Sequence, residues 1–368
     1  MTSPRASLQR LTITPAPKGD GWRFVRAEGP DPARVLEGRT VAEAARLAPR
    51  IFNLCGAAHG FAAARALGLP AEADAEAMIR ESRRDHALAI LHTWPSLCGG
   101  APDRAALASL AQPGGAPAGG APAGGAPALA GALVGERLAA EDFTAQSVAA
   151  LNRWLAAGPT ATARILSRLR GLDPACGRAG LPELGRVDLE RALLGDLQPP
   201  LHARGATPPE PAPFPLRETG ALGRVAATPL FAELLAAEGP SLFVRLLARL
   251  ADLLSLGAVM PGSSHAPLVP FGATRADRSA GQSTLSLGHA EAARGLLGHG
   301  AQVVAGRVAG YRILSPSAWN LAPGGLLEQA FARLAPGPDT AFVAGFLISA
   351  INPCVPVTLD LQGALADA

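Results

Sequence analysis

Two cysteine-containing segments at opposite ends of the chain constrain its fold more than any other feature. Residues 50–59 (RIFNLCGAAH) contain Cys55, and residues 352–360 (NPCVPVTLD) contain Cys354. The other two cysteines, Cys98 and Cys176, lie far from both segments, so the four thiols form no zinc-type or Cys-x-x-Cys pattern. A lone Cys-x-x-x-His in an apolar stretch is more often a buried thiol and a satisfied core histidine than a ligand pair. The interpretation of both segments therefore depends on the rest of the chain.

Several stretches agree, in order, with motifs of one protein class. Residues 50–59 resemble R-I-C-G-x-C-x-x-x-H, and residues 352–360 resemble D-P-C-x-x-C-x-x-H, the two cysteine motifs of nickel-iron hydrogenase large subunits. Three further segments are similar to R-I-E-G-H, E-A-P-R-G-x-x-x-H and P-T-T-W-N-x-x-P of the same subunits: residues 18–22 (KGDGW), 291–299 (EAARGLLGH) and 315–323 (SPSAWNLAP). Residues 36–39 (LEGR) lead into the first cysteine motif at the usual distance. The resemblance spans nearly the whole chain.

Each cysteine motif has lost one thiolate. Phe52 stands at the first cysteine of the N-terminal pair, Val357 at the second cysteine of the C-terminal pair, and Asp360 at the final histidine. The resemblance therefore implies that a four-thiolate nickel site cannot be built here.

A short chain with half of the metal thiolates resembles the accessory branch, the HupK/HoxV family of hydrogenase expression and formation proteins. The resemblance implies a non-enzymatic maturation factor, a scaffold or carrier for the Fe(CN)2CO unit during active-site assembly, with iron bound transiently and no nickel. The implied partners are a small iron-carrying chaperone with its scaffold complex, and the hydrogenase large-subunit precursor. One alternative is a metal-free mimic of the large subunit that recruits maturation chaperones, and a more distant one is a degenerate iron-only redox enzyme.

Cys55 and Cys354 are the candidate iron ligands, because low-spin ferrous iron prefers soft thiolates. By the family motifs Cys55 aligns with an iron ligand and Cys354 with a nickel-only ligand. A site with two thiolates and a site on Cys55 alone are both open.

Cyanide nitrogens accept hydrogen bonds, and a guanidinium offers several donors in a fixed geometry. Arg294 matches the family arginine beside these ligands, and Glu291 of the same motif is a further candidate near them. The alternative is a structural arginine that pairs with Glu291. His59, at i+4 from Cys55, is either a donor to the same pocket or a hydrogen-bonded interior histidine. Asp20 replaces the family glutamate next to the ligands, unless it only forms a turn.

Other polar residues are assigned structural roles. We expect Trp319 and Asn320 to pack and to brace the C-terminal motif. We expect Asp85, His86 and His92 to lie on a partly exposed helix face, and Cys98 and Cys176 to be buried or half-buried thiols.

The fold class predicted is α+β and predominantly helical, similar to the large subunit, with small β elements near the termini. Residues 8–26 alternate around a glycine turn and predict a strand pair, and residues 75–91, 142–154 and 160–169 have helical spacing. Residues 230–254 predict two helices broken at residues 239–240. Residues 1–368 are treated as one domain because the two cysteine motifs must meet, with a disordered Gly/Ala/Pro insertion at 112–130.

Composition argues against two partner classes. A formal net charge of +3 over 368 residues, with scattered basic residues, gives no reason to expect nucleic acid. The apolar stretch at residues 241–260 is interrupted by Arg245, Arg249 and Asp252, and the stretch at 341–351 is too short for a bilayer. With no apolar run near the N-terminus, we expect a cytoplasmic protein without a membrane partner.

Overall fold

The structure is a computed structural model that describes residues 6–16, 21–70, 75–110, 125–135, 143–197, 215–258, 278–280, 283–334 and 337–361. Its helices are α1 (Val41–Ile51), α2 (Gly56–Ala66), α3 (Ala75–Leu88), α4 (Trp94–Leu97), α5 (Arg104–Ser109), α6 (Gly125–Val134), α7 (Val148–Ala157), α8 (Ala161–Arg170), α9 (Arg186–Leu197), α10 (Ala221–Val225), α11 (Pro229–Glu238), α12 (Leu242–Ala258), α13 (Pro316–Asn320), α14 (Leu326–Phe331) and α15 (Thr340–Ile351). The strands are β1 (Ala6–Pro15), β2 (Trp22–Pro30), β3 (Arg278–Ala280), β4 (Ser283–Ala292), β5 (Gly295–Val304), β6 (Arg307–Leu314) and β7 (Val357–Leu359). Short helical turns are η2 (Pro32–Leu36), η3 (Asn53–Cys55) and η4 (Ala89–Thr93). The predominantly helical α+β class predicted from the sequence is confirmed.

The first sheet joins the two ends of the chain. Its strand order is β2-β1-β7, with β1 and β2 antiparallel, as the alternating pattern of residues 8–26 predicts. Strand β7 pairs in parallel with β1 at residues 11–13, and Leu11 and Ile13 are fully buried against the core. The pairing fixes the segment after Cys354 beside the N-terminal hairpin.

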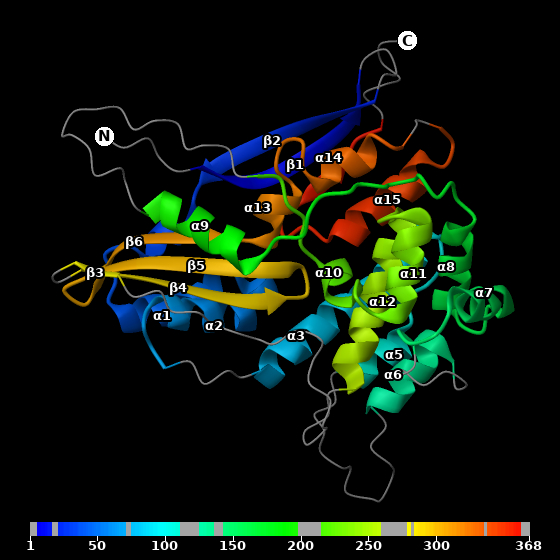
Figure 1. Cartoon of the computed structure of the whole chain (residues 1–368), viewed down its shortest axis with the longest axis horizontal. Coiled ribbons are helices and arrows are strands. Elements are labelled where there is room, and N and C mark those ends of the chain that lie inside the picture. Colours follow the sequence, from blue (N-terminus) through cyan, green and yellow to red (C-terminus); the bar gives the residue numbers. More distant parts are fainter. Residues whose placement is uncertain are drawn as a thin grey trace, which may run out of the picture.

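The second sheet has the order β3-β4-β5-β6 and is antiparallel throughout. It lies within the last third of the chain, so the prediction of small β elements only near the termini is wrong for these strands. Both faces are covered, by α2 on one side and α9 on the other (Figure 1). A sheet buried on both faces lacks polar alternation, which explains why the period-2 signal was missing.

Glycines let the covering helices approach this sheet closely. A Cβ at Gly288 would lie 2.2 Å from the carbonyl oxygen of Ala62 in α2, and one at Gly300 would lie 2.4 Å from Leu197 in α9. The hairpin between β4 and β5 turns through Ala293 and Arg294, with Gly295 at φ 121°. The tip of this hairpin therefore presents Arg294 toward the helical body.

The helical body surrounds α12, which packs against α3, α8, α10 and α15 (Figure 1). The predicted break at residues 239–240 is confirmed, because α11 ends before Gly239, whose φ is 70°. Along α12 nearly every side chain is buried, including Arg245, Arg249 and Asp252. Charges in such a core must be paired, which identifies α12 as a carrier of buried ion pairs.

The predicted insertion at residues 112–130 needs a correction at its end. Residues 112–124 lie outside the described part of the chain, whereas residues 125–130 belong to α6. Leu129 and Leu133 of this helix are buried in the core, so their burial outweighs the weak helix propensity of the preceding Gly/Pro repeat. Among the helices in the described ranges, none combines the length and the hydropathy needed to cross a membrane.

Candidate metal centre

Cys55 lies at the junction of η3 and α2, and its side chain is buried, with 7% of the residue exposed. The first amides of α2 are fixed by Glu81 of α3, whose carboxylate accepts from the N–H of Ala57 at 2.8 Å and of Ala58 at 3.4 Å. A carboxylate at a helix N-terminus satisfies otherwise unpaired donors. The helix that follows Cys55 is thereby held in place against α3.

Arg294 is the direct polar partner of this thiol. Its Nη1 donates to Sγ of Cys55 over 3.0 Å, and its Nη2 donates to Oδ1 of Asp85 over 2.7 Å. Its Nε is buried, and no acceptor for it exists among the described residues. The alternative pairing of Arg294 with Glu291 is wrong, since Glu291 accepts instead from Arg224 over 3.2 Å.

Asp85 lies at the centre of the site. Besides Arg294, its carboxylate accepts from Arg249 over 3.2 Å and from the amide of Asn352 over 2.6 Å. Burial favours the neutral acid, but Arg249 and Arg294 outweigh it and lower the pKa of Asp85. The predicted position on a partly exposed helix face is wrong for the fully buried His86, whereas Asp85 is partly exposed and His92 is exposed.

Cys354 reaches the same region from the other end of the chain. Its segment follows α15, where Asn352 has the left-handed φ of 55°. The Cys354 amide donates to Oγ of Ser317 over 2.9 Å, and its Sγ lies 3.9 Å from Oγ of Ser315. The Pro356 carbonyl accepts from the amide of Leu11 in β1 over 3.0 Å, so the segment is held at both sides.

One guanidinium interacts with both thiols. Burial lowers the pKa of Arg294, but Asp85 and then Cys55 and Cys354 outweigh this and raise it above its ordinary value. For the Cys55 thiol, burial raises the pKa to about 11, with Arg294 acting in the opposite direction. Cys55 is thus a protonated thiol at neutral pH, and a metal that binds it must displace a proton.

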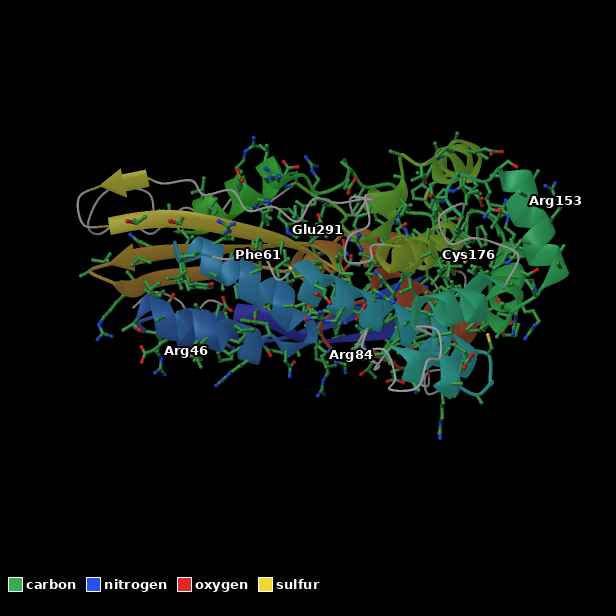
Figure 2. The ribbon with its side chains drawn as sticks, turned by 90° about the horizontal axis from the view of Figure 1, so that it is seen from below. Arg46, Phe61, Arg84, Arg153, Cys176 and Glu291 are labelled. Atoms are coloured by element: carbon green, nitrogen blue, oxygen red, sulfur yellow. The ribbon has the colours of Figure 1, made fainter. Side chains whose placement is uncertain are left out.

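Behind Asp85 the buried charges continue as an alternating network. Arg249 donates from Nε to Nδ1 of His86 over 3.3 Å, and Nε2 of His86 lies 2.8 Å from Asp252. This arrangement assigns the proton of neutral His86 to Nε2, because Nδ1 accepts. Asp252 in turn accepts from Arg224 over 2.6 Å. Figure 2 shows Glu291, the far end of this network, where the second sheet meets the helical body.

His59 is a hydrogen-bonded interior histidine, which was one of the two interpretations of its motif. Its Nδ1 lies 2.9 Å from Nε2 of His299, whose Nδ1 lies 2.8 Å from the hydroxyl of Tyr311. The ring of Phe52 stacks on His59 with centroids 4.6 Å apart. Burial, and then the charge of Arg294, lower the pKa of His59 to about 3, so it is neutral. Phe52, which replaces a family cysteine, therefore packs against an imidazole.

The remaining predicted residues are Trp319, Asn320 and Asp20. Asn320 binds both the N–H and the C=O of Thr219, at 3.0 and 2.7 Å, and Trp319 packs under the second sheet. Ser317 and Ser315 of the same segment contact Cys354 in the C-terminal motif. Asp20 falls outside the described residues.

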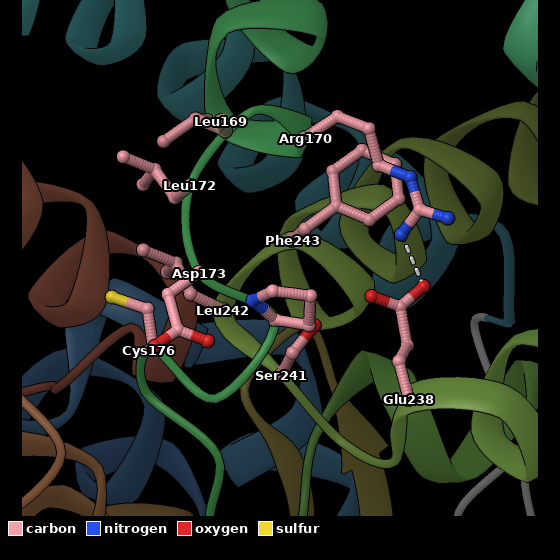
Figure 3. A pocket seen from close by; sticks show the side chains of 10 residues that line it. Leu169, Arg170, Leu172, Asp173, Cys176, Glu238, Ser241, Leu242 and Phe243 are labelled. Atoms are coloured by element: carbon pink, nitrogen blue, oxygen red, sulfur yellow. Dashed lines mark hydrogen bonds and ion pairs between the residues drawn. The ribbon is translucent and has the colours of Figure 1, made fainter.

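The other cysteines lie elsewhere. Cys176 lines a small pocket with Asp173 and with the Arg170–Glu238 ion pair, and neither Cys55 nor Cys354 contributes to that pocket (Figure 3). Cys98 and Cys176 are both partly buried, as expected. Across the ranges the structure covers, no cluster of three or more His, Cys, Asp or Glu side chains is arranged to hold a metal. The available donor set is two thiols with guanidinium and amide donors beside them.

Sequence reasoning missed Asp85, Arg224, Arg249 and Asp252. A signal was present, because Arg245, Arg249 and Asp252 recur at i, i+4 and i+7 within an otherwise apolar helix. Charges on one face of such a helix indicate buried ion pairs. The spacing of these residues along α12 does not indicate that Asp85 on α3 is a partner.

Solved structures that are similar to this chain define its fold class. The Ni-Fe-Se hydrogenase from D. vulgaris Hildenborough aligns with a TM-score of 0.51 over 92% of this chain and 94% of its own, at 16% identity. The Ni-Fe-Se hydrogenase from Desulfomicrobium baculatum aligns with a TM-score of 0.52 over 92% and 95%, at 14% identity. The fold is therefore that of a nickel-iron hydrogenase large subunit.

Sequence relatives narrow the assignment further. The chain is 31% identical over 338 residues to the hydrogenase expression/formation protein HupK of Rhodobacter capsulatus, covering 90% of this chain and 91% of the relative. It is 28% identical over 403 residues to the hydrogenase expression/formation protein HoxV of Cupriavidus necator, covering 100% and 99%. No family model matches the chain. The chain belongs to the HupK/HoxV family of hydrogenase expression/formation proteins.

Proposed function

We propose that this chain is a maturation factor for nickel-iron hydrogenase that holds the Fe(CN)2CO unit while the active site is assembled. The observation that carries the proposal is the position of Arg294, which contacts Cys55, interacts electrostatically with Cys354 and keeps one buried donor unused. The names of the relatives, hydrogenase expression/formation proteins, support the maturation role.

Cys55 is the primary iron ligand in this proposal. A thiolate suits low-spin ferrous iron, and the buried thiol gives up its proton on binding because the metal offsets the cost of the charge. Cys354 supplies the second thiolate, from a segment that is anchored to Ser317 and to β1. Two thiolates hold the cargo less firmly than four, which suits a carrier that must release it.

Arg294 recognises the diatomic ligands. Nη1 and Nη2 already donate to Cys55 and Asp85, whereas the buried Nε–H has no acceptor among the described residues and is therefore a donor that a cyanide nitrogen can use. An unpaired buried donor is costly, so an acceptor that enters with the cargo gains this energy. Recognition of cyanide by Arg294 thereby distinguishes the complete unit from bare iron.

Nickel has no place in the proposed site. Phe52 offers an aromatic ring that is already stacked on His59, and Val357 lies in the β7 strand paired with β1. The role is therefore to carry and transfer iron in the cytoplasm, without turnover of hydrogen. The partners are the small iron-carrying chaperone with its scaffold complex and the large-subunit precursor.

The test is hydrogenase maturation in the host with Cys55→Ala, and with Cys98→Ala as the matched control. Both variants are first checked by thermal unfolding, so that loss of the fold is recognised. We expect Cys55→Ala to abolish hydrogenase activity and Cys98→Ala to leave it unchanged. Wild-type maturation with a folded Cys55→Ala variant would overturn the carrier role and favour the metal-free mimic that recruits chaperones.

A further inference from the structure

Asn352 connects the two halves of the candidate metal centre. It is the first residue after α15, and its Nδ2 donates to Oδ2 of Asp85 over 2.6 Å. The opposite oxygen, Oδ1 of Asp85, accepts from Arg294, which in turn contacts Cys55. A continuous series of hydrogen bonds thus runs from the N-terminal cysteine to the residue two positions before Cys354.

We propose that Asn352 is a positioning residue, which sets the Cys354 segment against the Arg294–Cys55 half of the site through Asp85. This role of Asn352 rests on the proposed function, because it explains how two thiols from opposite ends of the chain reach one cargo.

The amide is chemically suited to this task where a carboxylate is not. The motif that residues 352–360 resemble begins with aspartate, whereas this chain has asparagine. A carboxylate at 352 would face the carboxylate of Asp85 at hydrogen-bond distance, and like charges there repel unless one is protonated. The amide donates a hydrogen bond without adding charge. Asp85 then remains ionised between two arginines, Arg294 and Arg249.

A simpler role for Asn352 would be conformational. Asparagine tolerates the left-handed φ of 55° and commonly ends helices in this way. That role alone would be filled equally well by glycine, which reaches the same φ without strain. Asn352→Gly therefore separates the two roles, because it keeps the backbone conformation and removes only the amide.

The contacts of Cys354 provide a direct readout. The Cys354 amide donates to Ser317, so its hydrogen exchange reports on whether the segment stays docked. Measuring exchange on the metal-free chain keeps the result independent of iron. Amides of α8, in the helical body, serve as the internal reference.

The experiment compares site-resolved hydrogen exchange of wild type, Asn352→Gly, Asn352→Asp and the combined variant Asn352→Asp/Asp85→Asn. We expect exchange at the Cys354 amide to rise roughly ten- to a hundredfold in both single variants, the order expected for losing one hydrogen bond to a charged group. The combined variant restores an amide–carboxylate pair with the polarity reversed, so exchange should return toward the wild-type rate.

Wild-type exchange at Cys354 in Asn352→Gly would overturn the inference and leave only the helix-ending role. Equal acceleration in the single and combined variants would also overturn it, because the effect would not come from the 85–352 pair. Accelerated exchange in the variants, together with wild-type protein that is purified from its host without bound iron, would leave the inference standing and contradict the proposed function alone.

Discussion

Replacing Arg294 by methionine tests the energetic role of the guanidinium at the centre of the site. Methionine keeps an unbranched apolar stem, but it is shorter than arginine and has no charge and no donor. The substitution removes the charge-assisted contacts with Cys55 at 3.0 Å and with Asp85 at 2.7 Å. Hydrogen bonds to charged groups contribute about 1.5–3 kcal/mol each.

The loss of stability is limited because Asp85 keeps other hydrogen-bond donors. Asp85 keeps Arg249 and Asn352 as donors, so it is not left as an unpaired buried charge, for which the cost would be about 3–5 kcal/mol. We therefore expect Arg294→Met to lower the free energy of unfolding by about 2–4 kcal/mol. Since Arg294 lowers the pKa of Cys55, the same variant should raise that pKa above about 11.

The assay is urea denaturation of the metal-free chain at pH 7 under reducing, anaerobic conditions. Arg170→Met is the control, because Arg170 also pairs with a carboxylate, that of Glu238, but is partly exposed and belongs to a different region. Partly exposed ion pairs contribute about 1 kcal/mol or less. Equal destabilisation by the two variants, or none by Arg294→Met, would refute the reasoning about the buried network.

Three further predictions concern the packing around the site. Gly288→Ala places a Cβ 2.2 Å from the Ala62 carbonyl oxygen, and should destabilise the fold by about 1–3 kcal/mol in thermal unfolding; an unchanged melting temperature would contradict the close packing of α2 on β4. His59 is neutral in the fold, with a pKa of about 3, but protonates near pH 6.5 when unfolded, so stability should fall as pH drops from about 6.5 toward 3. His59→Gln should reduce this slope by up to about 1.4 kcal/mol per pH unit, measured by urea titrations between pH 4 and 7; an unchanged slope would show that His59 titrates normally. Phe52→Leu removes the ring stack on His59 and should cost about 0.5–1.5 kcal/mol by the same urea assay, whereas a more stable variant would argue against the stack.

The sequence predicted the features that rest on local patterns or on motifs. The N-terminal hairpin follows from alternation around a glycine turn, and the break between α11 and α12 follows from residues 239–240. Arg294 was predicted beside Cys55 from its motif, and the structure has them 3.0 Å apart.

The features that sequence reasoning missed depend on contacts between distant segments. Asp85 is 209 residues from Arg294 and 267 residues from Asn352, so no local pattern indicates that these three meet. Asp85 is covered by Arg249 from α12, Arg294 from the β4–β5 hairpin and Asn352 after α15, which come together only in the folded chain.

The second sheet was missed for a related reason. Strands covered on both faces contain no polar alternation. The glycines at 288, 298 and 300 lack a Cβ and thereby allow α2 and α9 to pack closely on the sheet. Small residues that serve close packing resemble breakers when they are read along the chain alone.

The central claim is that Cys55 holds iron carrying cyanide and carbonyl ligands. Infrared spectroscopy of the protein, purified anaerobically from its host, tests it in the region where metal-bound cyanide and carbonyl stretch, for wild type and Cys55→Ala side by side. The account predicts cyanide and carbonyl bands in the wild type that are absent from the variant. A wild-type spectrum without such bands, together with no iron by elemental analysis, would contradict it.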